Sequence, residues 1–206
     1  GRLIGVIDSE HPRKNFYDGE QLNTVVAIAS MMATQISRFD MVNQLKEVVA
    51  KLEQSSKVQD SLFEIAELIF TTDNIDKFYQ QLHLSIGRLT FANNFYIALQ
   101  SDDNKSIVLP YCADEKDDVL QNERISLETT IPSISGYVLK TNQPLLIYKD
   151  QIAQKIRNNE FHIIGSLPQA WLGVPFGDES LKGLVVVQSY SDGYIFTEKD
   201  KLLLTF

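Results

Sequence analysis

The sequence has little cysteine, no cluster of basic residues and no long apolar run. Its one cysteine, Cys112, excludes an internal disulfide framework, which is typical of a reducing compartment and predicts a cytoplasmic location. A net charge of −8 without a Lys/Arg patch argues against nucleic acid and anionic membrane surfaces as partners. The longest apolar runs, such as 184–187, are far shorter than the ~20 residues of a membrane-spanning helix, so we expect no direct membrane contact.

Glycine and proline are absent between Gly19 and Gly87. Apolar residues recur through this segment at helical and then coiled-coil spacing, with an irregular step from Phe39 to Leu45. They are Leu22, Val25, Val26, Ala29, Met32, Ala33, Ile36, Phe39, Leu45, Val49, Leu52, Phe63, Ala66 and Phe70. One helix over 20–70 would be about 75 Å long. A small domain cannot bury such a rod, so we expect a homodimer through this helix. The alternative is two shorter helices with a kink near Ser55-Ser56.

The remaining pattern indicates an α+β domain. Helices are expected over 75–89, 133–141 and 149–160, and the capping residues 71–74 separate the first of these from the long helix. Strands are expected over 95–99, 107–111, 144–148, 171–176 and 181–190, while 113–132 is polar and irregular. Thr197 and Asp200 form a capping-box pattern that opens a last helix, which we expect to continue beyond Phe206.

An internal repeat relates the two ends of the chain. Leu3–Ile7, Phe16 and Leu22 echo Leu181–Val185, Phe196 and Leu202. We therefore interpret 1–40 as the last strand and helix of an incomplete upstream domain, 41–59 as a helical linker and 60–206 as a second copy. Because a single strand is not stable in water, residues 1–10 should pair with another chain or lack sheet contacts.

Motifs along nearly the whole chain resemble the GAF family of sensory domains. They are Asn94–Leu99, Pro110-Tyr111 with Asp114–Asp117, Ser135–Leu139, Trp171–Pro175, Gly183–Tyr190 and, in the first copy, Ile4–Pro12. The resemblance implies a twisted antiparallel sheet of about six strands, with the terminal helices on one face and a ligand pocket on the other. It is closest to a bacterial subgroup that often lies beside PAS, GGDEF or histidine-kinase modules, and it implies signal relay through helices across a dimer.

The chain lacks a recognisable catalytic constellation. His11, His83 and His162 lie on unrelated elements without the spacing of a helical zinc site, and neither a phosphate-binding loop nor a nucleophile elbow occurs. The acidic run 114–118 is more typical of a solvated face than of a metal site. We therefore expect no catalytic residues and no metal.

The resemblance leaves the cofactor unassigned. The Asn-Lys…Phe…Asp-Glu pattern of cyclic-nucleotide binding is missing, Cys112 is not in the loop where bilins attach, and only His162 is near the region for haem ligation. The simplest interpretation of Cys112 is a small buried apolar residue.

Polar and aromatic residues on otherwise apolar elements are the candidate ligand contacts. They are Tyr96, Tyr111, Asp114, Tyr137, Trp171 and Gln188. For Asp114 the alternative to ligand contact is a solvated surface position. For each of the other five residues the alternative is packing in the core.

Three functions follow from these patterns. The first is a regulatory sensor that binds a small molecule and relays the change through dimeric helices to an output domain outside the chain, a diguanylate cyclase or a histidine kinase. The alternative is a ligand-free dimerisation and spacer module. An enzyme acting through the acidic loop is disfavoured, because no nucleophile or base lies at a recognisable spacing.

Overall fold

The computed structural model of the chain describes residues 4–14, 16–71, 74–118, 123–178 and 180–205. The chain divides into two compact units, Gly1–Ser56 and Lys57–Phe206. Some residues used in the predictions above lie outside the described part: Leu3, the side chain of Phe70, Thr72, Asp73, Glu179 and Phe206.

The first unit consists of an irregular segment and most of helix α1 (Gly19–Thr71, 53 residues). A reciprocal capping box begins this helix, because Gln21 N donates to Asp18 Oδ1 at 3.0 Å and Asp18 N donates to Gln21 Oε1 at 3.1 Å. Without an internal glycine or proline, nothing in the backbone interrupts the helix before Thr71. The single helix predicted over 20–70 is therefore confirmed.

The segment before α1 forms no strand over residues 4–10, and Val6 is 83% exposed. This agrees with the expectation that an isolated strand lacks sheet contacts within this chain. The interpretation of 1–40 as the end of an upstream domain, and of 41–59 as a linker, stays a prediction.

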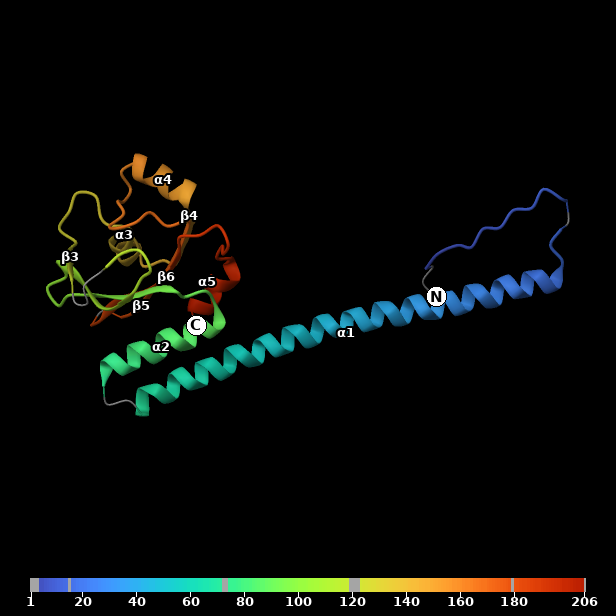
Figure 1. Cartoon of the computed structure of the whole chain (residues 1–206), viewed down its shortest axis with the longest axis horizontal. Helices are drawn as coiled ribbons and strands as arrows, with labels where there is room; N and C mark the ends of the chain where they lie inside the picture. Colours follow the sequence, from blue (N-terminus) through green and yellow to red (C-terminus); the bar gives the residue numbers. More distant parts are fainter. Residues whose placement is uncertain (1–3, 15, 72–73, 119–122, 179, 206) are drawn as a thin grey trace. The chain divides into compact units, whose positions relative to one another are not determined.

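The second unit contains a six-stranded sheet in the order β3-β2-β1-β6-β5-β4. Figure 1 labels β3, β4, β5 and β6 of this sheet. All the neighbouring strands are antiparallel. The strands are β1 (Asn94–Gln100), β2 (Ser106–Ala113), β3 (Arg124–Ser126), β4 (Leu145–Tyr148), β5 (Ala170–Gly177) and β6 (Lys182–Ser189). The predicted α+β class and the number of strands are confirmed.

Helices cover both faces of this sheet. On the first, which we name the α2 face, α2 (Ile75–Leu89) and α5 (Glu198–Thr205) lie over alternate strand residues such as Phe95 and Leu172. On the second, the cavity face, α3 (Ile134–Thr141) and α4 (Lys149–Arg157) lie over Trp171 and Val186. The alternation follows from the two-residue period of a strand, which sends successive side chains to opposite faces.

Two elements depart most clearly from the sequence prediction. Strand β3 lies in the segment expected to be irregular; it has three residues and pairs only with Ser106–Val108 at the sheet edge, so it gives almost no alternation to detect. Helix α4 ends at Arg157 rather than 160, because Asn159 is left-handed with φ 57°. The amide of Glu160 then bonds Lys155 O at 3.0 Å, which closes the last turn.

Polar groups on the α2 face are paired with one another. His83 contacts Tyr111 OH through Nδ1 at 2.9 Å and Ala92 O through Nε2 at 2.6 Å, and its ring stacks on Phe95. This histidine therefore joins α2 to the start of β1 and to β2, as a packing residue rather than a ligand.

Asp200 connects α5 to the end of α2. Its carboxylate accepts hydrogen bonds from Thr90 Oγ1 at 2.6 Å, from Thr197 N at 2.8 Å and Oγ1 at 2.7 Å, and from Tyr194 OH at 3.1 Å. The predicted pairing of Thr197 with Asp200 at the start of the last helix is thus present.

Candidate functional site

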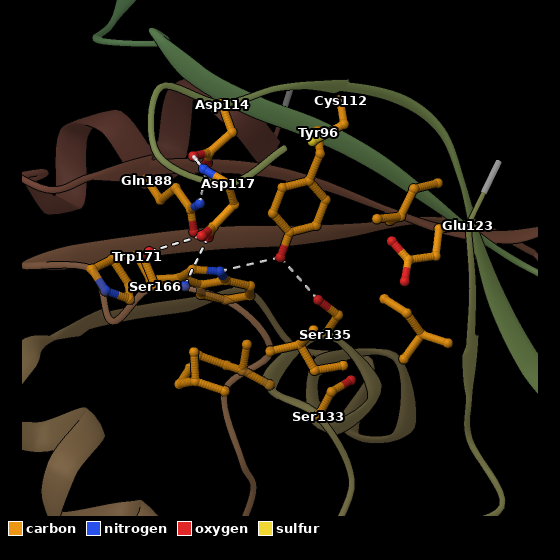
Figure 2. A pocket seen from close by; sticks show the side chains of 16 residues that line it. Tyr96, Cys112, Asp114, Asp117, Glu123, Ser133, Ser135, Ser166, Trp171 and Gln188 are labelled. Atoms are coloured by element: carbon orange, nitrogen blue, oxygen red, sulfur yellow. Dashed lines mark hydrogen bonds between the residues drawn. The ribbon is translucent and has the colours of Figure 1, made fainter. Parts of the chain in front are cut away.

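A cavity of about 80 Å³ lies on the cavity face, between the sheet, the N-terminal end of α3 and two loops (Figure 2). The loops are the acidic loop, residues 113–118, and the segment 163–168. The volume is well below the roughly 300–1,000 Å³ of sites for drug-sized ligands, so only a small molecule fits.

Tyr96 is at the centre of one wall of the cavity. Its hydroxyl is 2.9 Å from Ser135 Oγ and accepts a hydrogen bond from Trp171 Nε1 at 3.3 Å (Figure 2). Burial raises the pKa of this phenol to about 12, so it is a neutral donor and acceptor near neutral pH. Strands β1 and β5 hold the two rings, and Ser133 fixes the start of α3 by accepting from Gly136 N at 3.1 Å.

The opposite wall is a network around two carboxylates. Asp114 Oδ2 accepts from Gln188 Nε2 at 2.6 Å and from Tyr190 OH at 3.0 Å. Asp117 accepts from Ser166 N and Oγ, both at 2.8 Å (Figure 2), and from Tyr190 OH at 3.1 Å. These bonds hold the acidic loop against β6 and against the segment 163–168.

Buried Asn94 fixes the start of the acidic loop. Its Nδ2 donates to Gln188 O at 3.2 Å, and its Oδ1 accepts from Glu115 N at 2.8 Å. Asp114 Oδ1 accepts from Lys116 N and Asp117 N, which turns the loop back towards the cavity.

The network also determines the protonation of its members. Burial and the neighbouring charge of Asp114 raise the pKa of Tyr190 far above its usual value, so this phenol stays protonated. Burial opposes ionisation of Asp117, but the hydrogen bonds from Ser166 outweigh it and lower the pKa of this carboxyl. Asp117 is therefore a carboxylate near neutral pH.

Solved structures with a similar fold are distant in sequence. The GAF domain of a phosphoenolpyruvate-protein phosphotransferase from Coxiella burnetii is 13% identical, with a TM-score of 0.57 over 73% of this chain and 87% of that chain. The corresponding GAF domain from Acinetobacter is 16% identical, with a TM-score of 0.56 over 71% and 85%. No protein-family model and no curated protein sequence matches.

This chain has the GAF fold.

The GAF fold alone does not decide between sensing and catalysis. A free methionine-R-sulfoxide reductase from Neisseria meningitidis, solved in complex with its substrate, is also similar, at 15% identity and a TM-score of 0.53 over 72% of this chain and 81% of that chain. The function of this chain must therefore be argued from its own residues.

Four of the six candidate residues line the cavity of this GAF fold: Tyr96, Asp114, Trp171 and Gln188. Tyr137 does not line it. Its ring packs against Phe161, with centroids 5.5 Å apart, and lies below Lys155 Nζ at 5.8 Å. It therefore supports α3 and α4 from behind the cavity.

Tyr111 lies on the α2 face, where it contacts His83, and not in the cavity. Simple alternation from Leu109 places Tyr111 on the cavity face. However, the β1–β2 register shifts between Ile97 and Leu99, so that β2 contains one extra residue around Pro110. The extra residue reverses the faces beyond it, and Cys112 lines the cavity instead.

The sequence prediction missed other cavity residues. Asp117 and Ser135 lie in motifs that resembled the GAF family, so the resemblance pointed to their region without naming them. Ser166 gave no signal, because it reaches Asp117 only through tertiary folding. Tyr190, which joins the two carboxylates, was noted only as the end of a strand.

Cys112 is half-buried rather than fully buried. Burial, with the nearby charges of Asp114 and Asp117, raises the pKa of its thiol to about 11, so it is not a thiolate nucleophile near neutral pH. Within the described residues no group of three or more His, Cys, Asp or Glu side chains is placed to hold a metal ion. His162 Nδ1 is 3.0 Å from Ile131 O, and this histidine does not line the cavity.

Proposed function

We propose that this chain is a regulatory sensory module of a bacterial signalling protein. The observation that carries the proposal is the cavity, where polar groups from β1, β6, α3 and two loops converge on the face opposite α2 and α5. A small molecule binds there and alters an output domain outside this chain, a diguanylate cyclase or a histidine kinase. The similarity to GAF domains of phosphotransferase proteins supports a regulatory role.

A path for the signal begins at Tyr190. This residue directly follows β6 and contacts both cavity carboxylates. The chain then leads through Thr197 to α5, and Asp200 connects α5 to Thr90 at the end of α2. A ligand that binds two arrangements of Tyr190 with different affinity shifts the balance between two positions of these helices.

A filled cavity tests this proposal. Ile164 lines the cavity and is 52% exposed, so Ile164→Trp should fill the entrance without disturbing the core. Leu167, 42% exposed in the same loop, does not line the cavity, and Leu167→Trp is the matched control. In a thermal-shift screen of metabolites, at least one compound should raise the melting temperature of the wild type and of Leu167→Trp but not of Ile164→Trp. A screen in which no compound separates the two variants would contradict the proposal.

The second candidate function is a ligand-free dimerisation and spacer module, and helix α1 favours it. Leu45, Val49 and Leu52 are 62%, 44% and 69% exposed, and Phe63 is 71% exposed. By length and composition alone, α1 also contains a stretch, within Gly19–Glu67, that is apolar enough to cross a membrane. A second copy of this helix covers the same exposed side chains without a membrane. The sensory function proposed above uses the same dimer.

The mass of the chain in detergent-free buffer tests the dimer. We expect sedimentation to give a dimer for the wild type, a monomer for the double variant Val49→Glu, Leu52→Glu, and a dimer for the polar-position control Gln44→Glu. A monomeric wild type, or a requirement for detergent, would contradict pairing through α1. If a ligand binds without any change in the dimer, the result would support neither the spacer function nor signal relay through the helices. The chain would then be a domain that only binds its ligand.

A further inference from the structure

The carboxylate wall of the cavity has negative charge without a matching positive charge. Asp114 and Asp117 both contact the hydroxyl of Tyr190, at 3.0 and 3.1 Å. A phenol has one proton, so it donates to one carboxylate at a time. Their other side-chain donors, Gln188 Nε2 and Ser166 Oγ, are neutral.

No basic side chain balances this charge from within the cavity. Among the described residues that line it, none is Lys, Arg or His, while Glu123 adds a third carboxyl group. The charge of Lys116 is felt by Asp117 and contributes to its lowered pKa, but Lys116 Nζ lies over the ring of Tyr190, 4.8 Å from the centroid, and does not line the cavity. Two partly desolvated carboxylates of this kind attract a cation and disfavour an anion.

Gln188 provides an independent indication of a missing donor. Because a carboxylate only accepts, the amide must present Nε2 to Asp114, and the same nitrogen donates to Tyr190 OH at 2.7 Å. Both amide hydrogens are then used, and Oε1 has no partner among the described residues. The side chain is 9% exposed and lines the cavity.

Gln188 lines the cavity, and within the described residues no fully enclosed side-chain oxygen or nitrogen lacks a partner. A nearly buried acceptor beside a cavity is satisfied by ordered water or by the donor of a ligand.

Much of the remaining lining of the cavity is aliphatic. Leu109, Ile125, Ile134, Ile163, Ile164 and Pro168 line it. A hydrated metal ion gains nothing from such side chains, whereas a short alkyl group gains hydrophobic contact.

We propose that the cavity binds a small organic ammonium ion. Its N–H groups donate to Gln188 Oε1 and to the carboxylates of Asp114 and Asp117, and its alkyl part contacts the isoleucine side chains. This inference rests on the proposed sensory function and names the ligand class for the same cavity.

Three ligands of equal length test the charge directly. They are n-propylammonium, 1-propanol and propionate, added to the full chain at constant ionic strength. Trp171 is the only tryptophan and its indole N–H donates to Tyr96 beside the cavity, so its single indole NMR signal reports occupancy. We expect saturable shifts with n-propylammonium alone, and weaker binding as NaCl is raised.

Three variants connect the binding to the carboxylate wall. Ile164→Lys supplies an ammonium group from the chain itself and should weaken n-propylammonium binding by about tenfold or more, as expected when charge-assisted hydrogen bonds are lost. Leu167→Lys, which places the same charge outside the cavity, should bind like the wild type. Asp114→Asn should weaken binding to a similar extent; if circular dichroism shows that it is unfolded, Ile164→Lys decides alone.

The outcomes separate this inference from the proposed function. If 1-propanol or propionate binds as tightly as n-propylammonium, and Ile164→Trp abolishes that binding, the proposed ammonium class is wrong. The proposed sensory function would not be contradicted by that result. Binding of none of the three, or equal weakening by Ile164→Lys and Leu167→Lys, would also overturn it. The proposed function is then judged by the metabolite screen, which makes no assumption about charge.

Discussion

The two faces of the sheet differ in how their buried polar side chains are paired. On the α2 face, both ring nitrogens of His83 have partners, and the carboxylate of Asp200 accepts four hydrogen bonds from three residues. On the cavity face, Asp114 also accepts four hydrogen bonds, but Asp114 and Asp117 share one phenol proton, and Gln188 Oε1 has no partner among the described residues. The two faces therefore differ in the closeness of two carboxylates and in one acceptor beside a cavity, and not in the number of hydrogen bonds that a carboxylate accepts.

This difference assigns different roles to the two faces. The α2 face should determine the stability of the domain, because its core is closed and its polar groups are satisfied. The cavity face should determine ligand response, and its substitutions should cost comparatively little stability. The four predictions below test that division.

The largest expected effect is on the α2 face. Phe95 is fully buried and stacks on His83 with ring centroids 4.6 Å apart, so Phe95→Ala removes both core volume and that contact. We expect it to lower the free energy of unfolding by about 3–5 kcal/mol, measured by urea denaturation. The control Phe176→Ala, at a side chain that is 39% exposed, should cost less than half as much. Equal losses would show that the α2 face is not the stabilising one.

The second prediction concerns acid. Burial by itself raises the pKa of Asp200, but the hydrogen bonds from Thr90 and Thr197 outweigh it and lower the pKa below its usual value. A carboxyl with a lowered folded-state pKa stabilises the protein above its unfolded pKa of about 3.9, and the contribution disappears as the pH falls through the folded value.

Asp200→Asn should therefore cost about 1–3 kcal/mol near neutral pH, because one acceptor oxygen is replaced by a donor. Its unfolding free energy should also fall less steeply than that of the wild type between about pH 5 and pH 3. Thermal denaturation across this range measures both. Parallel curves for the two proteins would show that Asp200 is not a source of acid sensitivity.

The third prediction concerns the cavity face. Gly165 has φ +82°, and a Cβ there would contact the carboxylate of Asp117. Gly165→Ala should cost about 1–2 kcal/mol through backbone strain and should loosen the bonds between Ser166 and Asp117. The free energy of ligand binding in the cavity should then fall by more than the free energy of unfolding. Gly193→Ala, where the nearest atom to an added Cβ is Ser191 Oγ at 3.6 Å, is the control and should change neither.

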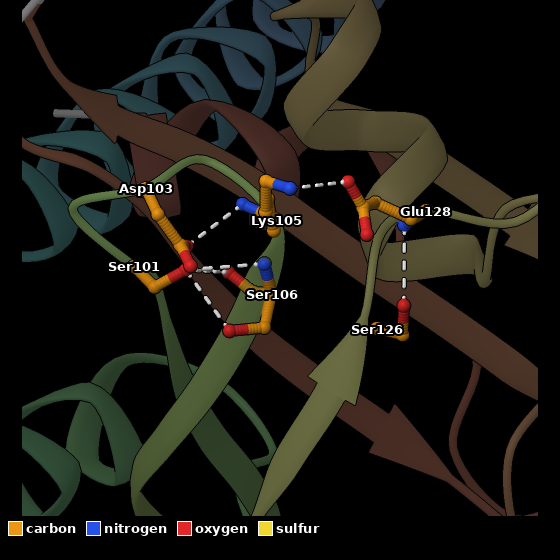
Figure 3. Close-up of polar contacts among 6 residues, drawn as sticks. All are labelled: Ser101, Asp103, Lys105, Ser106, Ser126 and Glu128. Carbon is orange, nitrogen blue, oxygen red and sulfur yellow. Dashed lines mark hydrogen bonds and ion pairs between the residues drawn. The ribbon is translucent and has the colours of Figure 1, made fainter.

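The smallest effect is expected at the hairpin surface (Figure 3). Lys105 Nζ is 3.0 Å from Glu128 Oε1, and the two side chains are 61% and 63% exposed. Since exposed ion pairs contribute little, Glu128→Gln should change stability by less than about 0.5 kcal/mol and should leave ligand binding unchanged. A larger loss of binding would mean that charge far from the cavity contributes to recognition.

Much of the fold could be predicted because its signals are local. Long α1 follows from the absence of glycine and proline and from an apolar repeat, and α3 follows from Ser133 acting as its cap. Strands β1, β5 and β6 have strong apolar patterns. Strand β3 does not, since only Ile125 of its three residues is partly buried.

The site was harder to predict because it depends on long-range geometry. Tyr96, Trp171 and Gln188 were found as polar or aromatic residues in apolar strands. Trp171 pairs directly with Gln188, and Tyr96 pairs with Val186, two residues from Gln188 on β6. Tyr111 was misplaced because a register shift is set by pairing with β1 and not by β2 alone. Ser166 was invisible because its partner is 49 residues away in sequence.

The extra residue around Pro110 has a consequence for how this domain tolerates insertions and deletions. Shortening β2 by one position at the bulge would restore an uninterrupted ladder with β1, which is usually regarded as the more regular arrangement. Leu109 and Tyr111 would then be neighbours on the strand, and plain alternation would keep each on its present face: Tyr111 would still contact His83, and Cys112 would still line the cavity. A single-codon deletion at the bulge should therefore leave both faces of the domain in place.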